Sequence, residues 1–210
     1  MTDCSTLGVR VGVLGDGGWL AYRNHSGEVA LALFEAVKEV LSQASLSLGQ
    51  LAGFIFCEGP GSTLGIRINA MALRTWNSLG NKPRPVFAYK SLEAAAILVR
   101  LSEANDSAFT LFSDLRKNAW NACSGNSDGS TSTIEVVPKE SLGNWKERRY
   151  FIQQRLYSPG APPESEPLNY DLEPLGASDD FINLFQPVEQ PAVYQTTTTQ
   201  FKKWVPQRHR

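Results

Sequence analysis

The stretch of sequence that decides the fold is Cys57-Glu58-Gly59-Pro60-Gly61-Ser62-Thr63-Leu64-Gly65-Ile66-Arg67. It ends a nearly continuous apolar run that starts at Leu51, which is typical of a strand covered on both faces. Ser62 can cap the amino end of a helix expected over Thr63–Leu79, and Gly80 can end that helix. The stretch therefore predicts a strand, a glycine-rich turn and a helix.

Two interpretations of this turn are open. Free N–H groups at the start of a helix can receive an anion, aided by the helix dipole. However, the turn has neither the GxxxxGK[ST] pattern of a phosphate-binding loop nor the GxGxxG spacing of a dinucleotide site. The alternative is a tight turn in which the glycines allow close packing. Spacing alone favours close packing.

The segments around this stretch predict an α/β domain. A hairpin is expected from Val9–Leu14 and Trp19–Tyr22, because Gly15-Asp16-Gly17-Gly18 between them supplies a tight turn. Apolar residues then recur at three and four positions, which predicts a helix over Glu28–Leu41. A further strand at Pro85–Tyr89 and a helix from Ser91 complete an order that is typical of a mixed sheet with flanking helices.

The second half of the chain has a weaker pattern. Short strands are expected at Phe109–Phe112, Ala119–Cys123, Ile134–Val137 and Tyr150–Ile152, and a short helix at Asp179–Phe185. A boundary near Leu101–Ser107 would divide the chain into an N-terminal domain, residues 1–104, and a smaller second domain with a variable C-terminal region, residues 105–210.

Composition narrows the classes of function. The 210 residues are 42% hydrophobic and 20% charged, with a formal net charge of −1. Proteins that bind nucleic acid alone usually carry a strong basic excess, so a link to RNA would run through a partner. Three distant cysteines favour a reducing compartment, and two histidines exclude a multi-histidine metal site. With no long apolar run and no signal-peptide pattern, a cytoplasmic protein is expected.

Residues 57–67 resemble the GPGSFTGLR signature shared by the TsaB (YeaZ) family and TsaD proteins. Other segments follow in the family's order: Asp3-Cys4-Ser5-Thr6 resembles its D-T-S-T, His25-Ser26 its H-S-E, Val86–Ala95 its V-x-V-x-S-L-E-A, and Asp114-Leu115-Arg116-Lys117 its D-A-R-R. The likeness covers roughly residues 3–123, and Pro191–Tyr194 resembles a late P-x-Y segment. This succession is more specific than any single motif.

The resemblance implies an actin-like ATPase (ribonuclease H-like) fold, with a mixed sheet, flanking helices and a smaller, degenerate second α/β domain. It implies a non-catalytic scaffold for a TsaD-like subunit that transfers threonylcarbamoyl to tRNA, and hence no catalytic or metal-binding residues. The signature residues for binding or structure would be Gly59, Pro60, Gly61, Ser62, Gly65 and Arg67. No cofactor is expected on the chain alone, and ATP or ADP would bind only at an interface with the catalytic partner.

The resemblance also implies partners. These are the TsaD-like subunit, a TsaE-like ATPase and a second copy of the chain, with tRNA contacted only indirectly and no membrane. The helix over Thr63–Leu79 supports such contacts, because it is apolar on both sides of a narrow polar stripe, and a helix with one solvated face should be more polar. The expected interface residues are Leu33, Val37, Ala70, Leu73 and Trp76.

The sequence departs from the family in one important place. Family members usually have an apolar strand before their D-T-S-T, whereas only Met1 and Thr2 precede Asp3. Two explanations are open: the start lies upstream, or the sheet has lost or rebuilt a central strand.

Parts of the sequence also fit functions other than a scaffold. Gly125-Asn126-Ser127-Asp128-Gly129 fits GxSxG, but a hydrolase elbow needs a core strand before it and a helix after it. A stand-alone glycoprotease-type hydrolase would also need a base, which only His25 or His209 could supply. A dimeric interaction protein without a role in tRNA modification is a third reading. The basic and aromatic tail, Phe201–Arg210, fits either RNA contact or a solvated terminus.

Overall fold

The computed structural model describes residues 1–80, 82–103, 107–116, 118–141, 147–154 and 160–194. The boundary expected near residue 104, Lys117, and the tail with His209 lie outside these residues. Within them, one sheet has six strands, in the order β11 (Gln186–Val188), β5 (Val86–Lys90), β4 (Phe54–Gly59), β1 (Thr2–Asp3), β2 (Gly8–Gly15) and β3 (Gly18–Ser26).

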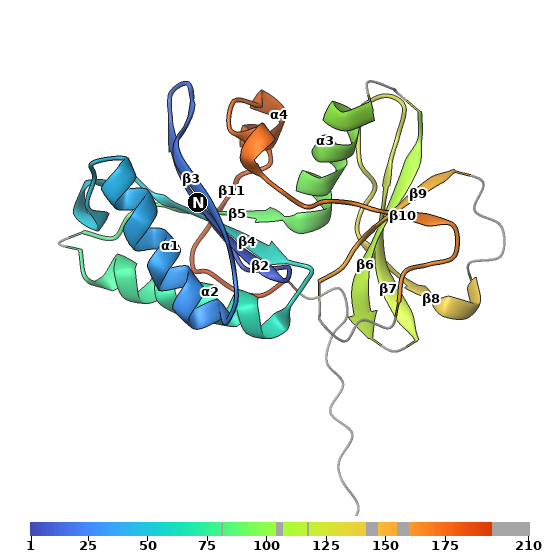
Figure 1. The fold of residues 1–210 in the computed structure, drawn as a ribbon, viewed down its shortest axis with the longest axis horizontal. Helices are drawn as coiled ribbons and strands as arrows, with labels where there is room; N and C mark the ends of the chain where they lie inside the picture. The colour runs from blue at the N-terminus through green and yellow to red at the C-terminus, as the bar shows by residue number, and fades with distance from the viewer. Residues whose placement is uncertain (81, 104–106, 117, 142–146, 155–159, 195–210) are drawn as a thin grey trace, which may run out of the picture.

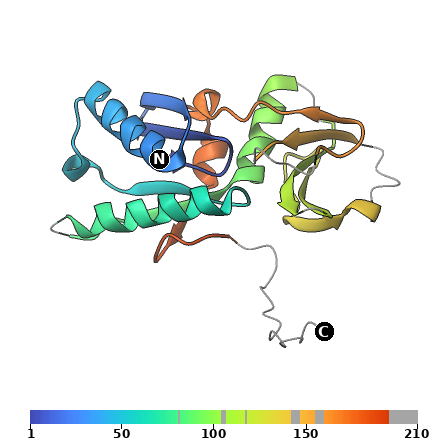
Figure 2. The same cartoon turned by 60° about the horizontal axis from the view of Figure 1, so that its bottom comes forward.

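Helices cover both faces of this mixed sheet (Figure 1). On one face, α1 (Val29–Gln43) and α2 (Thr63–Ser78) lie side by side, as Figure 2 also shows. They bury the alternate apolar residues of β2, β4 and β5. The opposite face packs against α3 (Ser91–Glu103) and α4 (Asp179–Asn183). The predicted fold class, an α/β protein with a mixed sheet and flanking helices, is confirmed.

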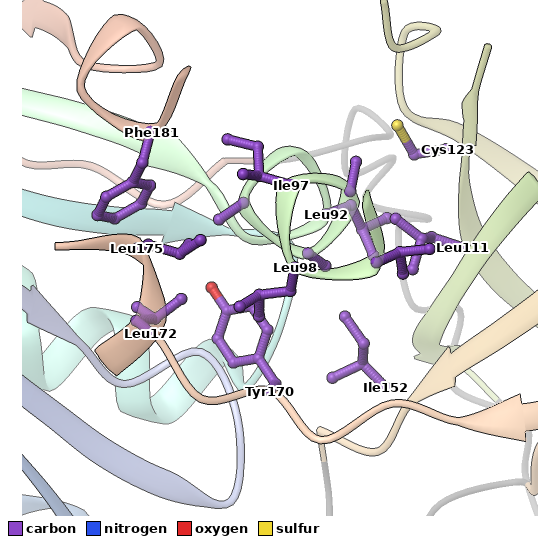
Figure 3. Packing of buried hydrophobic residues seen from close by; sticks show 14 of the residues in the cluster. Leu92, Ile97, Leu98, Leu111, Cys123, Ile152, Tyr170, Leu172, Leu175 and Phe181 are labelled. Carbon is purple, nitrogen blue, oxygen red and sulfur yellow. The ribbon is translucent and has the colours of Figure 1, made fainter. Parts of the chain in front are cut away.

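The second sheet has, among the described residues, five strands in the order β10 (Ser165–Pro167), β9 (Arg148–Ile152), β6 (Phe109–Arg116), β7 (Ala119–Gly125) and β8 (Glu135–Pro138). Short 3-10 turns occur at Leu48–Gln50, Lys139–Ser141 and Glu173–Leu175. In Figure 3, the helix α3 lies between the two halves, with Leu92 beside Leu111 of the second sheet and Leu98 beside Tyr170. One apolar core is therefore shared by both sheets. No helix in the described part of the chain is long and apolar enough to span a membrane.

After residue 168 the chain returns to the first sheet. Its strand β11 pairs antiparallel with β5, and Phe181 of α4 is fully buried against Tyr89 and Phe185. The sequence predicted α4 but not β10 or β11. The division into residues 1–104 and 105–210 stays a prediction, and the sheets divide the chain differently, because β11 belongs to the first sheet.

The central strand β1 is only two residues long. It pairs antiparallel with β2 and parallel with β4, so Thr2 and Asp3 occupy the central position of the sheet. The Met1 α-amino group extends the pairing by donating to the Gly12 carbonyl at 2.7 Å. Burial lowers the pKa of this amino group from about 8 to about 5.

We expect Phe181→Ala to lower the free energy of unfolding by about 3–5 kcal/mol, since a fully buried ring leaves a cavity. Urea unfolding measures the change. Ile182→Ala is the matched control on the same helix, because Ile182 is 43% exposed. Equal, small effects of both substitutions would show that α4 does not share in the cooperative unfolding of the first sheet.

We expect the Met1 amino group to make stability rise between pH 5 and pH 8. Its folded pKa of about 5 lies below its ordinary value of about 8, so the unfolded state binds more protons in this window. The penalty is full below pH 5 and absent above pH 8. The test compares urea midpoints of the free chain and the N-acetylated chain. Their difference should widen as the pH falls, and a constant difference would contradict the prediction.

Candidate functional site

The turn between β4 and α2 is built for close contact with the turn between β1 and β2. Gly59 has φ +117°, a conformation that side-chain-bearing residues rarely adopt. A Cβ atom on Gly61 would lie 2.2 Å from the Ser5 carbonyl oxygen, and one on Gly65 would lie 2.2 Å from the Cys4 carbonyl oxygen. Packing against Ser5 and Cys4 therefore requires Gly61 and Gly65, and the backbone conformation requires Gly59.

The polar groups of this turn bond within the chain. The Ser62 N–H donates to the Ser5 carbonyl at 2.8 Å, and the Gly65 N–H donates to Ser62 Oγ at 3.3 Å, which confirms Ser62 as the helix cap. The Pro60 carbonyl accepts from Ser91 Oγ at 2.6 Å and from Gln154 Nε2 at 2.8 Å. These contacts favour the packing interpretation over an anion site.

The carboxylate of Asp3 lies at the centre of the site and is fully buried. Its Oδ1 accepts from the Ser5 N–H at 2.7 Å, and its Oδ2 accepts from the hydroxyls of Tyr89 at 2.7 Å and Tyr170 at 2.8 Å. Burial, and then the nearby Asp3, raises the pKa of both tyrosines well above its ordinary value. Both hydroxyls therefore stay protonated and act as donors.

We call the cluster of Asp3, Ser5, Tyr89 and Tyr170 the junction. The guanidinium group of Arg10 packs against one side of it. Arg10 is buried, donates to Thr6 Oγ1, and lies 4.9 Å from the centre of the Tyr170 ring. Such a cation stacked on an aromatic face is stabilising when it is shielded from water. Asp3, Ser5 and Thr6, which resemble the family's D-T-S-T, are thus buried beneath side chains of the same chain.

Sequence reasoning missed Tyr170 and Gln154, which complete the junction from the second half of the chain. Tyr170 lies where the hydrophobic pattern had weakened, so no periodicity marked it. Gln154 follows β9, and its N–H donates to the buried Asp114 Oδ2 at 2.9 Å. Asp114, from the segment resembling D-A-R-R, therefore has a structural partner. A lone polar residue gives no sequence signal for such long-range contacts.

The three cysteines and Ser127 have settings that do not favour a role as nucleophile. Burial raises the pKa of all three thiols, to about 11 for Cys123, which suppresses the reactive thiolate. Within the described part of the chain, no group of three His, Cys, Asp or Glu side chains could hold a metal ion. Ser127 is exposed in a turn after β7 rather than between a core strand and a helix. Its setting does not match a hydrolase elbow.

Comparison with solved structures shows which known fold this chain shares. No protein-family model and no curated protein matches the sequence. Among solved structures, YeaZ from Pseudomonas aeruginosa superposes with a TM-score of 0.67 at 19% identity, covering 92% of this chain and 97% of that chain. The chain has the YeaZ fold. A second structure, an uncharacterized protein with similarity to peptidase YEAZ from Pseudomonas aeruginosa, has a TM-score of 0.63 at 20% identity and covers 87% of each chain.

The expected interface residues lie mostly inside this YeaZ fold. Leu33, Ala70, Leu73 and Trp76 are buried in the chain's own core, and Val37 is partly buried. A subunit contact at these positions stays a prediction. The apolar side chains that the same helices leave exposed are Leu31, Phe34, Leu64 and Met71, which are 53–69% exposed.

Two of these exposed side chains, Phe34 and Met71, line a hollow between α1 and α2. The hollow has a volume of about 380 Å³ and is lined by Phe34, Met71 and Trp76 among others. The Phe34 and Trp76 rings meet edge to face, with their centres 5.8 Å apart. Arg67 lies on the rim, exposed, and no hydrogen bond or ion pair joins it to the described part of the chain. Arg74, by contrast, donates to the Pro191 carbonyl and fixes the C-terminal segment on α2.

We expect Gly65→Ala to destabilise the YeaZ fold, although alanine favours helix by about 1 kcal/mol over glycine. The new Cβ would meet a backbone oxygen, so β1 or α2 must shift. Thermal unfolding measures the effect. Gly17→Ala is the control, because a Cβ there meets nothing within 4 Å. An unchanged or higher melting temperature for Gly65→Ala would remove the packing explanation of the signature.

Proposed function

We propose that this chain is a TsaB (YeaZ)-type scaffold subunit that supports a TsaD-like threonylcarbamoyl transferase in tRNA modification. The YeaZ fold and the ordered series of family-like segments support this proposal. The proposal is carried by one observation: side chains of the chain itself surround Asp3, whereas α1 and α2 expose an apolar face.

The filled junction argues against catalysis by the chain alone. A phosphate-binding turn must leave its N–H groups free for the ligand. Here Ser5 and Ser62 donate their N–H groups within the chain, and two tyrosines cover Asp3. The chain then contributes to a reaction by contact with a catalytic subunit, and any ATP or ADP would bind at that contact.

The face of α1 and α2 has the character of a protein contact. An aromatic and a methionine side chain stand over a hollow, and an arginine without a partner in the described chain lies beside them. Aromatic residues, Met and Arg are enriched in protein interfaces. We propose that a second copy covers this face when the chain is alone, and that the TsaD-like subunit covers it in the complex.

The test combines association with tRNA modification. Met71→Glu should weaken the dimer by about tenfold or more, since a charge would be buried unpaired in the contact. Leu101→Glu is the matched control, because Leu101 is equally exposed but lies on α3. Sedimentation gives the dimer affinity. The threonylcarbamoyladenosine content of tRNA in a complemented depletion strain gives the function.

The outcomes distinguish the scaffold from an interaction protein of another process and from a hydrolase. Loss of both dimer and modified tRNA with Met71→Glu, but not with Leu101→Glu, supports the scaffold. Arg67→Glu should act in the same direction while leaving the melting temperature unchanged. If the unmutated chain forms a dimer but does not restore tRNA modification in the depletion strain, an interaction protein of another process is favoured. Peptidase turnover that disappears with Ser127→Ala would favour the hydrolase.

A further inference from the structure

The charges of this chain are unevenly distributed along its sequence. The tail Phe201–Arg210 holds four Lys and Arg residues and no Asp or Glu, a charge of +4 in ten residues. Residues 1–200 hold the other 16 Lys and Arg and all 21 Asp and Glu, so their net charge is −5. A polyanion is therefore repelled by most of the chain and attracted by the tail.

Aromatic residues stand among the cations of this tail, which reads Phe-Lys-Lys-Trp-Val-Pro-Gln-Arg-His-Arg. Proteins that hold single-stranded nucleic acid combine cations for the phosphates with aromatic rings on which bases stack. Phe201 and Trp204 enclose two of the four cations. One short stretch therefore offers both kinds of contact.

The described chain fixes the point from which this tail leaves. Arg74 of α2 donates to the Pro191 carbonyl, from Nε at 3.1 Å and from Nη2 at 2.5 Å. The Tyr194 N–H donates to the Glu58 carbonyl at 2.8 Å, and Lys90 Nζ lies 5.4 Å from the centre of the Tyr194 ring. In Figure 2, β11 and the segment after it lie beside α2. Tyr194 is thus held at the end of β4, next to the turn that leads into α2.

The tail begins close to the exposed apolar face of α1 and α2. Six residues, Gln195–Gln200, join Tyr194 to the tail. An extended chain spans at most about 3.5 Å per residue, so Phe201 lies within roughly 25 Å of Tyr194. The apolar face includes Leu64 in the first turn of α2, the same end of the helix. The tail therefore starts beside the surface at which the proposed function places a transferase subunit.

We propose that the tail Phe201–Arg210 binds the tRNA that the docked subunit modifies, with its cations on phosphates and its aromatic rings on bases. The identity of the RNA rests on the proposed scaffold function, and the tail adds a direct contact to the indirect one that the resemblance implies. A membrane surface suits the tail less well, because such binding scales with buried apolar area. Only Phe201, Trp204 and Val205 in the tail have large apolar side chains.

The first test measures the affinity of the full chain for unmodified tRNA between roughly 50 and 200 mM salt. Lys202→Gln combined with Lys203→Gln removes two phosphate contacts. The slope of log affinity against log salt should then become shallower by about 1.5, and binding at low salt should weaken about tenfold. Lys38→Gln combined with Lys82→Gln is the matched control, because it removes the same charge from exposed positions of the described chain. It should leave affinity and slope unchanged.

A second variant separates stacking from charge. Trp204→Leu keeps every cation of the tail and an apolar side chain, but it removes the ring on which a base would stack. We expect it to weaken tRNA binding about tenfold at each salt concentration while the salt slope stays the same. Unchanged affinity would contradict the assignment of this ring to a base.

Other results would overturn the proposal as a whole. Equal affinity and slope for the two double variants would show that the tail does not contact RNA. Vesicles of phosphatidylserine and phosphatidylcholine are the probe for a membrane. Binding to them that depends on Lys202 and Lys203, without such a dependence for tRNA, would assign the tail to a membrane surface instead.

Sedimentation distinguishes a failure of this proposal from a failure of the scaffold function. The tail variants should keep the dimer affinity of the unmutated chain, because they leave α1 and α2 unchanged. If Met71→Glu weakens the dimer while the tail variants bind tRNA normally, the tail proposal alone fails. If the unmutated chain is a monomer whose tRNA binding depends on Lys202 and Lys203, the tail proposal stands and the dimer contact fails.

Discussion

The rest of the fold depends on the hydrogen bonds that the buried carboxylate of Asp3 accepts. A carboxylate without water is very costly unless donors surround it. Its donors come from three places: Ser5 beside it, Tyr89 at the end of β5, and Tyr170 from the chain's second half. This requirement brings β1, β5 and the returning segment to one point. Both tyrosines belong to the shared core around α3, and Figure 3 shows Tyr170 near Leu172 in that core.

The glycine signature follows from the same arrangement. The Ser5 N–H donates to Asp3, and the Ser5 carbonyl accepts from the Ser62 N–H. These bonds bring the two turns so close together that Gly61 and Gly65 have no room for a Cβ atom. A turn that looks like a phosphate-binding loop thus becomes a joint between a strand and a helix. The polar groups of the site hold parts of the chain together, while apolar side chains of α1 and α2 remain exposed.

Periodicity predicted the helices of the first half well, because their apolar patterns are long, and Ser62 marked the start of α2 as its cap. It failed at β10 and β11, which are three residues long and leave no period to detect. An apolar helix pattern also cannot tell the chain's own core from a subunit contact. Leu33 and Trp76, which were expected at an interface, are buried in the chain's own core, and a subunit contact at them stays a prediction. Tyr170 was missed because a single long-range hydrogen bond has no local signature.

The pairing of β11 with β5 has a consequence for synthesis of the chain. The strand at the edge of the first sheet is completed only by residues 186–188, about a hundred residues after β5. Until that segment leaves the ribosome, β5 presents an open edge and Asp3 lacks one of its tyrosines. Exposed edges invite pairing with other chains. The nascent protein therefore passes through an interval in which β5 can pair with a strand of another chain, and the arrival of β11 ends that interval.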